Sequence, residues 1–461
     1  MAGIGFELRK ISRSGSLESI FRSYAYSGII SSGPWIISII SLGFLTAILR
    51  GLLPQGEVAG IRLFSASVTH CYAFSLILVG PLQLVLTRHA SDKFFAKDRD
   101  SIFPSCFGAM TLTAILSAIV GGFFFVQLVG GALIYRISAT ALMVVVACIF
   151  IISNYLTALR DYKSVVVSFA SGYAASCLLA CLGCKFYGID AALFGFAAGH
   201  GVLLVLLLRC LHREFGVGGH SKKSGPWDFL RYFVRFPRLV LCGLFYNLGI
   251  WADKLMFWWL ASGHEKISDN LYAAPTYDTA IYLSLLSIVP GLAVFFLKLE
   301  TEFADRYQQF FNAIQNGGTL AQVRAAKTGV IEALRTGLSQ LFKVQLFTTV
   351  LLVAFAKPLG ERFGIGATQT GIFQITLFGA FLLVCFLSML TALFYFDDQK
   401  GALTAAFVFA AANAGLGYLT IRITEAWYGF GFVVAAGLGM LIVASRLNHR
   451  VARLEEMAFG R

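Results

Sequence analysis

Two charged residues interrupt an apolar stretch near the middle of the chain. Asp253 and Lys254 lie within residues 239–260, which hold no other charged side chain. A charged group at the centre of a lipid bilayer costs about 2.5–3.5 kcal/mol. We therefore expect both side chains to face protein or a water-filled cavity rather than lipid.

Aromatic and amide side chains accompany the pair at helical spacing. One helix face holds residues that follow each other by four, three and four positions, namely Asn247, Trp251, Lys254 and Trp258. Flat sugar faces can lie on tryptophan rings, while amide, carboxylate and ammonium groups exchange hydrogen bonds with hydroxyls. The pattern is typical of a path that conducts sugar.

Four further side chains extend this pattern. Tyr246 and Asp253 share an adjacent face of the same helix, and Asp278 and Tyr282 lie one turn apart in the next apolar stretch. The predicted translocation path comprises Tyr246, Asn247, Trp251, Asp253, Lys254, Asp278 and Tyr282. Two simpler readings stay open. Trp258 and Trp259 mark the external membrane interface, or Asp253 pairs with a basic residue on another span.

Proline and histidine provide weaker signals. Gly33 and Pro34 in the first apolar stretch, and Pro290 in the eighth, predict helix kinks, which serve either as hinges or as plain curvature. His70 and His200 lie in or near apolar stretches, where a packing role competes with proton transfer.

Long apolar stretches must position these residues. Between Arg22 and Arg50 the chain has no ionisable acid, base or histidine, and hydrophobic residues make up 57% of its 461 positions against 13% charged. A lipid-embedded helix needs about 20 consecutive apolar residues. We predict an all-α polytopic protein with about twelve spans, at 23–49, 60–87, 102–130, 137–159, 164–184, 190–208, 239–260, 277–297, 341–356, 371–395, 401–421 and 427–445.

The distribution of basic residues predicts orientation. If both ends of the chain are cytoplasmic, 28 of its 37 Lys and Arg residues fall in cytoplasmic segments and eight in external ones. This bias follows the positive-inside rule and requires an even number of spans. The net charge of +13 is thereby explained by topology and attraction to anionic lipid, not by nucleic-acid binding.

A long basic segment divides the spans into two sets of six. We predict an N-terminal bundle at 1–215, a cytoplasmic linker at 216–236, and a C-terminal bundle at 237–461 with a helical insertion at about 298–340. In the insertion, Thr319 and Gln322 have the spacing of a capping box, and the helix that follows either lies on the membrane surface or docks a partner.

Absent motifs exclude several chemistries. The chain has no G-x-x-x-x-G-K-[ST], H-E-x-x-H or G-x-S-x-G sequence. Cys177, Cys181 and Cys184 share a helix face without a histidine beside them, which favours packing over a metal. Asp397 and Asp398 fit a solvated turn. We therefore predict no enzyme activity, no cofactor and no metal. A cation-coupled drug antiporter, a flippase for lipid-linked oligosaccharides and a membrane glycosyl- or acyltransferase are the rival functions.

Several motifs carry a family resemblance. Residues 1–10 (MAGIGFELRK), 29–35 (IISSGPW), 299–303 (LETEF) and 395–398 (YFDD) resemble the PelG family, the membrane-embedded component of the bacterial Pel exopolysaccharide system. The resemblance implies a polysaccharide exporter of the multidrug/oligosaccharidyl-lipid/polysaccharide (MOP) superfamily, with two six-helix bundles in a V. It implies inner-membrane transport of nascent Pel, rich in N-acetylgalactosamine, for the biofilm matrix. It also implies three partners: a cytosolic glycosyltransferase, a cyclic-di-GMP receptor and a small inner-membrane scaffold protein.

Overall fold

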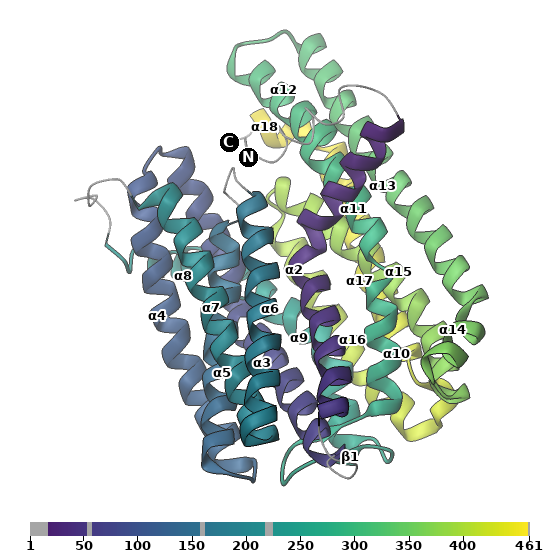
Figure 1. Ribbon diagram of the computed structural model, residues 1–461. Coiled ribbons are helices and arrows are strands. Elements are labelled where there is room, and N and C mark those ends of the chain that lie inside the picture. Colours follow the sequence, from purple (N-terminus) through teal and green to yellow (C-terminus); the bar gives the residue numbers. More distant parts are fainter. Residues whose placement is uncertain (1–16, 53–57, 157–161, 217–224, 460–461) are drawn as a thin grey trace. The chain divides into compact units, whose positions relative to one another are not determined.

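The computed structural model describes residues 17–52, 58–156, 162–216 and 225–459. Their regular elements are helices, apart from one short two-stranded hairpin. In chain order the elements are α2 (Leu17–Leu52), α3 (Val58–Phe95), η1 (Arg99–Ser101), α4 (Ile102–Gly121), η2 (Gly122–Leu128), α5 (Leu133–Leu156), α6 (Tyr162–Tyr187), α7 (Ile189–Phe215), α8 (Leu230–Arg235), α9 (Pro237–Leu260), β1 (Glu265–Lys266), β2 (Tyr272–Ala273), α10 (Pro275–Leu286), α11 (Val289–Lys298), η3 (Leu299–Phe303), α12 (Ala304–Gln315), α13 (Leu320–Ala354), α14 (Ala356–Phe363), α15 (Ala367–Tyr395), α16 (Gln399–Ile423), η4 (Glu425–Trp427), α17 (Phe430–Ala452) and α18 (Leu454–Phe459) (Figure 1).

The prediction of an all-α polytopic membrane protein is confirmed. Within the described residues, eleven helical stretches are long and apolar enough to cross a bilayer. The first predicted span, 23–49, falls in α2, where the described apolar stretch Ile37–Leu52 is shorter. The helical assignment of α2 runs through Gly33 and Pro34 without interruption.

Contacts divide the chain into two compact units, and their boundaries differ from those predicted. Unit 1 contains the chain up to Gly33, then Ala252–Phe257 and Thr276–Arg461, and unit 2 contains Pro34–Trp251 and Trp258–Pro275. Most of α9 packs in unit 2, and the first half of α2 packs in unit 1. The first half of α2 is held in unit 1 by Ser27, whose hydroxyl donates a hydrogen bond to the carbonyl of Ala293 at 2.7 Å.

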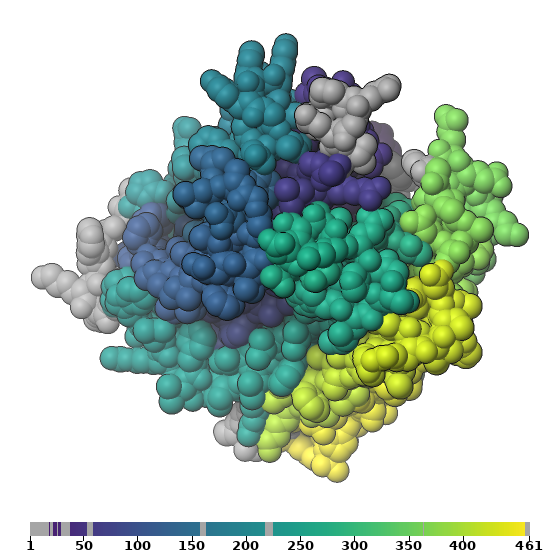
Figure 2. Space-filling model, turned by 90° about the horizontal axis from the view of Figure 1, so that it is seen from below, coloured from purple at the N-terminus to yellow at the C-terminus, as the bar shows by residue number. Residues whose placement is uncertain are grey.

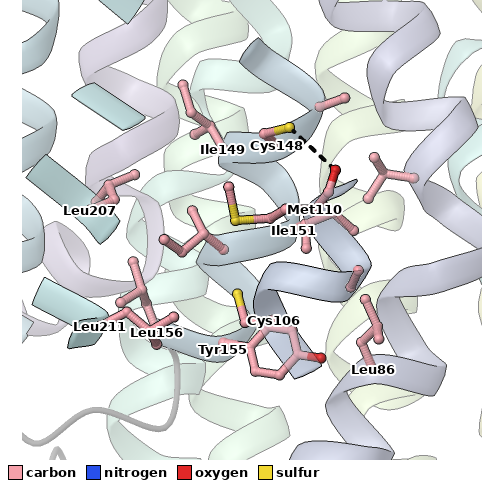
Figure 3. Packing of buried hydrophobic residues seen from close by; sticks show 14 of the residues in the cluster. Leu86, Cys106, Met110, Cys148, Ile149, Ile151, Tyr155, Leu156, Leu207 and Leu211 are labelled. Carbon is pink, nitrogen blue, oxygen red and sulfur yellow. Dashed lines mark hydrogen bonds between the residues drawn. The ribbon is translucent and has the colours of Figure 1, made fainter. Parts of the chain in front are cut away.

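One apolar cluster of unit 2 lies between α3, α4, α5, α6 and α7. Figure 3 shows part of it, with the Cys148 thiol directed at the carbonyl of Met110, 3.7 Å away. Cys106, Cys148 and Tyr155 are buried among leucine and isoleucine side chains. These cysteines act as small apolar packing residues.

A two-stranded hairpin closes one end of unit 2. Strands β1 and β2 pair in antiparallel register, with Glu265 opposite Ala273. The hairpin is fixed to its own unit by the Asn270 amide, which donates to the carbonyl of Leu128 at 2.9 Å, by an ion pair between Arg62 and Glu265, and by Leu271 in the apolar core. It lies at the lower end of Figure 1, the end that Figure 2 shows.

The eighth predicted span is interrupted in unit 1. Helix α10 ends at Leu286, two turn residues follow, and α11 restarts with Pro290 in its first turn. Proline lacks the amide proton that would continue the ladder. The interruption leaves the carbonyl of Ser287 to accept a hydrogen bond from the side-chain amide of Gln345 on α13, at 3.0 Å.

Helix α13 is one 35-residue element, and the helix that contains most of the predicted span 341–356 already begins at Leu320. At about 1.5 Å per residue the helix is about 52 Å long, well beyond the hydrocarbon thickness of about 30 Å. The predicted capping box is present, because Thr319 and Gln322 each accept a backbone hydrogen bond from the other. The first half of α13 packs beside α12 and projects with it at one end of unit 1 (Figure 1).

The turn before α16 is not solvated at Asp398, which corrects the sequence-based expectation. The Asp398 side chain is fully buried, and its Oδ1 caps α16 by accepting from the amide of Gly401 at 3.1 Å. Arg446 and Arg450 on α17 donate to its oxygens at 2.8–3.1 Å. Burial would raise the pKa of Asp398, but the hydrogen bonds from Arg450, Arg446 and Gly401 hold it below its usual value.

Candidate functional site

The seventh predicted span is helix α9, and it carries most of the predicted path. Pro237 occupies its first turn, where a missing amide proton costs nothing, and the extended backbone of Ala261 ends it. Residues Ala252–Phe257 belong to unit 1, whereas the flanking parts belong to unit 2. The predicted path is thus divided. Asp253, Lys254, Asp278 and Tyr282 lie in unit 1, and Tyr246, Asn247 and Trp251 lie in unit 2.

Asp253 and Lys254 form an ion pair with each other. The Lys254 ammonium donates to Oδ1 and Oδ2 of Asp253 at 3.1 and 3.3 Å. The hydroxyl of Tyr277 on α10 donates to Oδ2 at 2.6 Å. Asp253 is 0% exposed and Lys254 1%. The alternative in which Asp253 pairs with a base from another span is therefore replaced by pairing with its own neighbour in sequence.

Aromatic rings surround this pair in unit 1. Phe257 stacks on Tyr277 with ring centroids 3.8 Å apart, and Tyr428 meets Phe257 edge-on at 4.6 Å. The Lys254 ammonium lies 5.8 Å from the centroid of the Phe432 ring, within the range of a cation–π interaction. Removing either charge would leave the other buried without a counter-charge in apolar surroundings. The pair is thus stable only as a neutral unit.

Tyr277 was not predicted as a site residue. It is buried, and it directly precedes the predicted Asp278. A tyrosine near the end of an apolar stretch is also typical of membrane interfaces, so the sequence offered no reason to direct it at Asp253.

Asp278 and Tyr282 extend the polar surface of α10. Both are partly buried. The Tyr282 hydroxyl is enclosed and has no hydrogen-bond partner among the described residues. A buried hydroxyl without a partner costs free energy unless a further polar group reaches it. This atom is therefore a candidate contact for a polar substrate.

The path residues of unit 2 are held by close helix packing. Asn247 is buried and donates from Nδ2 to Gln83 Oε1 at 3.1 Å and to the carbonyl of Gly243 at 3.0 Å. Helices α3 and α9 touch at two glycines, because a Cβ on Gly243 would come within 2.1 Å of the carbonyl oxygen of Gly80. Tyr246 beside Asn247 is half-buried.

The two tryptophans that end α9 differ in environment. Trp258 is 1% exposed, so the prediction that it marks the external interface is wrong, whereas Trp259 is 36% exposed. Trp258 packs on His70, with ring centroids 4.2 Å apart, and its ring lies 6.0 Å from that of Trp251. Trp251 and Trp258 thus form an aromatic cluster inside unit 2.

His200 belongs to a buried hydrogen-bond network in unit 2. Its Nε2 meets the hydroxyl of Tyr72 at 2.8 Å, and its Nδ1 meets Ser176 Oγ at 3.0 Å. The hydroxyls of Tyr72 and Tyr173 are 2.7 Å apart. Because both ring nitrogens have partners, the packing interpretation explains this histidine fully.

No group of three or more His, Cys, Asp or Glu side chains in the described residues could hold a metal ion. The chemistry available at α9 and α10 is therefore hydrogen bonding, ion pairing and aromatic contact. Interactions of these kinds suit a polar molecule.

Known structures with the same fold are transporters. An outward-facing multidrug resistance MATE family transporter of the MOP superfamily aligns with 92% of this chain and 96% of its own, with a TM-score of 0.63 and 15% identity. A MOP superfamily transporter from Pyrococcus furiosus aligns over the same fractions, with a TM-score of 0.61 and 15% identity. MATE in the straight conformation gives 0.61 and 14% over the same fractions. The chain therefore has the MATE-like fold of MOP transporters.

The family that matches is described as "PelG: Putative exopolysaccharide Exporter (EPS-E)", and the match covers residues 1–459. The chain belongs to this family of exopolysaccharide exporters, which confirms the resemblance seen in its sequence motifs. A comparison with curated proteins found no significant match.

Proposed function

We propose that this protein carries nascent Pel polysaccharide, rich in N-acetylgalactosamine, across the bacterial cytoplasmic membrane for the biofilm matrix. The observation that carries the proposal is the match of nearly the whole chain to an exopolysaccharide exporter family. The multi-pass MATE-like fold supports a transport role rather than an enzymatic one. Fold alone would not select the substrate.

The proposed path uses the polar and aromatic side chains of α9 and α10. A neutral carboxylate–ammonium pair such as Asp253 and Lys254 offers sugar hydroxyls both acceptors and donors without a net charge. Trp251 supplies an aromatic face, and the Tyr282 hydroxyl supplies a hydrogen-bonding group with no partner among the described residues. Tyr277 joins the predicted set because it touches Asp253.

We propose that a cytosolic glycosyltransferase synthesises the polymer and that elongation of the polymer drives it across the membrane. The chain has no phosphate-binding loop for ATP hydrolysis. A long polymer fits poorly in an occluded cavity, which favours continuous threading over alternating access. The surface proposed for the synthase is the projecting pair of helices α12 and α13. The cyclic-di-GMP receptor and the small scaffold protein complete the proposed assembly.

Both termini are proposed to be cytoplasmic. Within unit 1, α2 begins at the same end as α18, so the described chain starts and finishes on one side (Figure 1). The bias of Lys and Arg assigns that side to the cytoplasm.

Two substitutions test the path. Trp251→Ala and Asp253→Asn are expected to lower extracellular polymer at least about tenfold when export is normalised to the amount of each variant in the membrane, because loss of either buried charge also destabilises the protein. Trp427→Ala and Asp100→Asn, both at exposed positions, serve as matched controls and are expected to export normally. Unchanged export in both path variants would contradict the proposed path.

The main alternative is a cation-coupled MATE-type drug antiporter, which the fold comparison favours. Such a protein would raise drug tolerance when expressed without its neighbours. A flippase for lipid-linked oligosaccharide would instead move short lipid-bound sugars. Membrane vesicles holding the chain and its co-purified synthase separate these functions: the proposal requires lumenal polymer that accumulates only when sugar nucleotide is supplied.

A further inference from the structure

Asp253 would be the natural cation site of unit 1 if Lys254 were absent. It is a carboxylate at full burial within a membrane-spanning helix, and such a group stays ionised only with a counter-charge beside it. In a transporter this counter-charge can be a small cation taken from solution. Here the next residue in the chain supplies it instead.

The ammonium of Lys254 uses much of the hydrogen-bonding capacity of the Asp253 carboxylate. It contacts both oxygens, at 3.1 and 3.3 Å, and the Tyr277 hydroxyl at 2.6 Å adds a third donor. A small cation would have to displace a group that is covalently attached to the same backbone, and an attached competitor acts at a high effective concentration.

The surrounding side chains also suit an ammonium. Tyr277 donates to the carboxylate, the centroid of the Phe432 ring lies 5.8 Å from the ammonium, and a Cβ on Gly417 would be 3.7 Å from the Cα of Asp253. The aromatic ring stabilises an ammonium without adding negative charge.

We propose that Lys254 is a built-in counter-ion that occupies a cation site at Asp253 and so uncouples this protein from sodium or other alkali cations at that site. Transport through the path then needs no cation gradient acting on Asp253. Replacing Lys254 by an apolar residue converts the site into one that binds a free cation.

Thermal unfolding of the purified full-length protein tests this without a transport assay. The melting temperature is compared in choline chloride and in sodium chloride of equal ionic strength. Wild type and Lys254→Arg are expected to melt at the same temperature in both salts. In choline chloride, Lys254→Met is expected to have a lower melting temperature than wild type. Saturating sodium is expected to raise the melting temperature of Lys254→Met by about 2–4 °C or more, because a cation that binds only the folded state stabilises it.

The double variant Asp253→Asn with Lys254→Met is the matched control. It removes both charges, so its melting temperature is expected to be the same in the two salts. Lys254→Ala provides a second route if the methionine variant does not fold. Ethylammonium, a small mimic of the lost side-chain end, is expected to stabilise Lys254→Ala more than choline does.

Either of two results would overturn the proposal. The first is a wild-type protein stabilised by sodium in a manner lost in Asp253→Asn. The second is a Lys254→Met protein that responds to sodium no more than the double variant. Because the readout is stability, neither result bears on whether the exported substrate is Pel.

Discussion

Gln345 on α13 donates a hydrogen bond to the carbonyl oxygen of Ser287, where the helix of the eighth span is interrupted ahead of Pro290. The side chain passes close to the backbone of α11, since a Cβ on Gly291 would lie 2.6 Å from Gln345 Oε1. A membrane helix can be interrupted only if a neighbour satisfies the backbone groups that are released. Here a single side chain from another helix does so.

Gln345→Leu is expected to destabilise the protein by about 1–3 kcal/mol, because the buried carbonyl of Ser287 loses its partner. Thermal unfolding in detergent measures the change. Gln308→Leu, on the exposed face of α12, is the control and should leave the melting temperature unchanged. Equal melting temperatures for the two variants would show that water replaces Gln345.

Asp398→Ala is expected to cost about 2–4 kcal/mol, because it removes a helix cap and leaves two arginines without their partner. Because Arg446 and Arg450 are partly exposed, the expected loss of stability is smaller than for a fully buried triad. Asp397→Asn should be nearly neutral, since asparagine tolerates the positive φ of 51° at that position. Chemical denaturation compares the variants. A neutral Asp398→Ala would contradict the assignment.

The same carboxylate predicts a pH dependence. Its pKa is lowered in the folded state, so its stabilising contribution is fully present above the unfolded pKa of about 3.9 and is lost as the pH falls through the folded value. The difference in stability between wild type and Asp398→Asn should therefore stay constant from about pH 8 to pH 5. A difference that shrinks within this range would place the pKa higher than the geometry implies.

Gly243→Ala is expected to destabilise unit 2 by about 1–3 kcal/mol, because the added Cβ would meet the Gly80 carbonyl at 2.1 Å. Gly201→Ala is the control, since no atom lies within 4 Å of the corresponding Cβ. The control should be neutral or slightly stabilising, as alanine favours helix. If Gly243→Ala loses no more stability than Gly201→Ala, then α3 and α9 move apart around the added Cβ without cost.

Membrane-impermeant thiol labelling tests the orientation. Lys266→Cys in the hairpin is expected to react in intact spheroplasts, and Asn316→Cys between α12 and α13 only after lysis. The wild-type protein is the control for its own cysteines, none of which is exposed in the described residues. Reaction of Asn316→Cys in intact spheroplasts would reverse the topology.

Apolar length and charge were enough to predict the fold, since a lipid-embedded helix has few alternatives. Boundaries were harder where a helix leaves the bilayer without ending. The predicted insertion at about 298–340 was separated from the span at 341–356, yet the backbone of α13 continues unbroken from Leu320 to Ala354. Hydropathy reports the surroundings of a helix and does not report where the helix stops.

Contacts between distant residues could not be predicted. The spacing placed Asn247, Trp251 and Lys254 on one helix face, but which unit each residue joins depends on how helices pack. Asp253 gave no sign that its partners would be the adjacent Lys254 and Tyr277. Likewise, Asp398 has the sequence context of an exposed turn, and only the position of α17 brings two arginines to it.

Helix α13 runs as a single continuous rod from Leu320 to Ala354. Leu320 at its projecting end and Gln345 beside the interrupted eighth span are 25 positions apart on a helix without a proline. A protein that tilts the projecting end therefore applies leverage on the amide that supports Ser287.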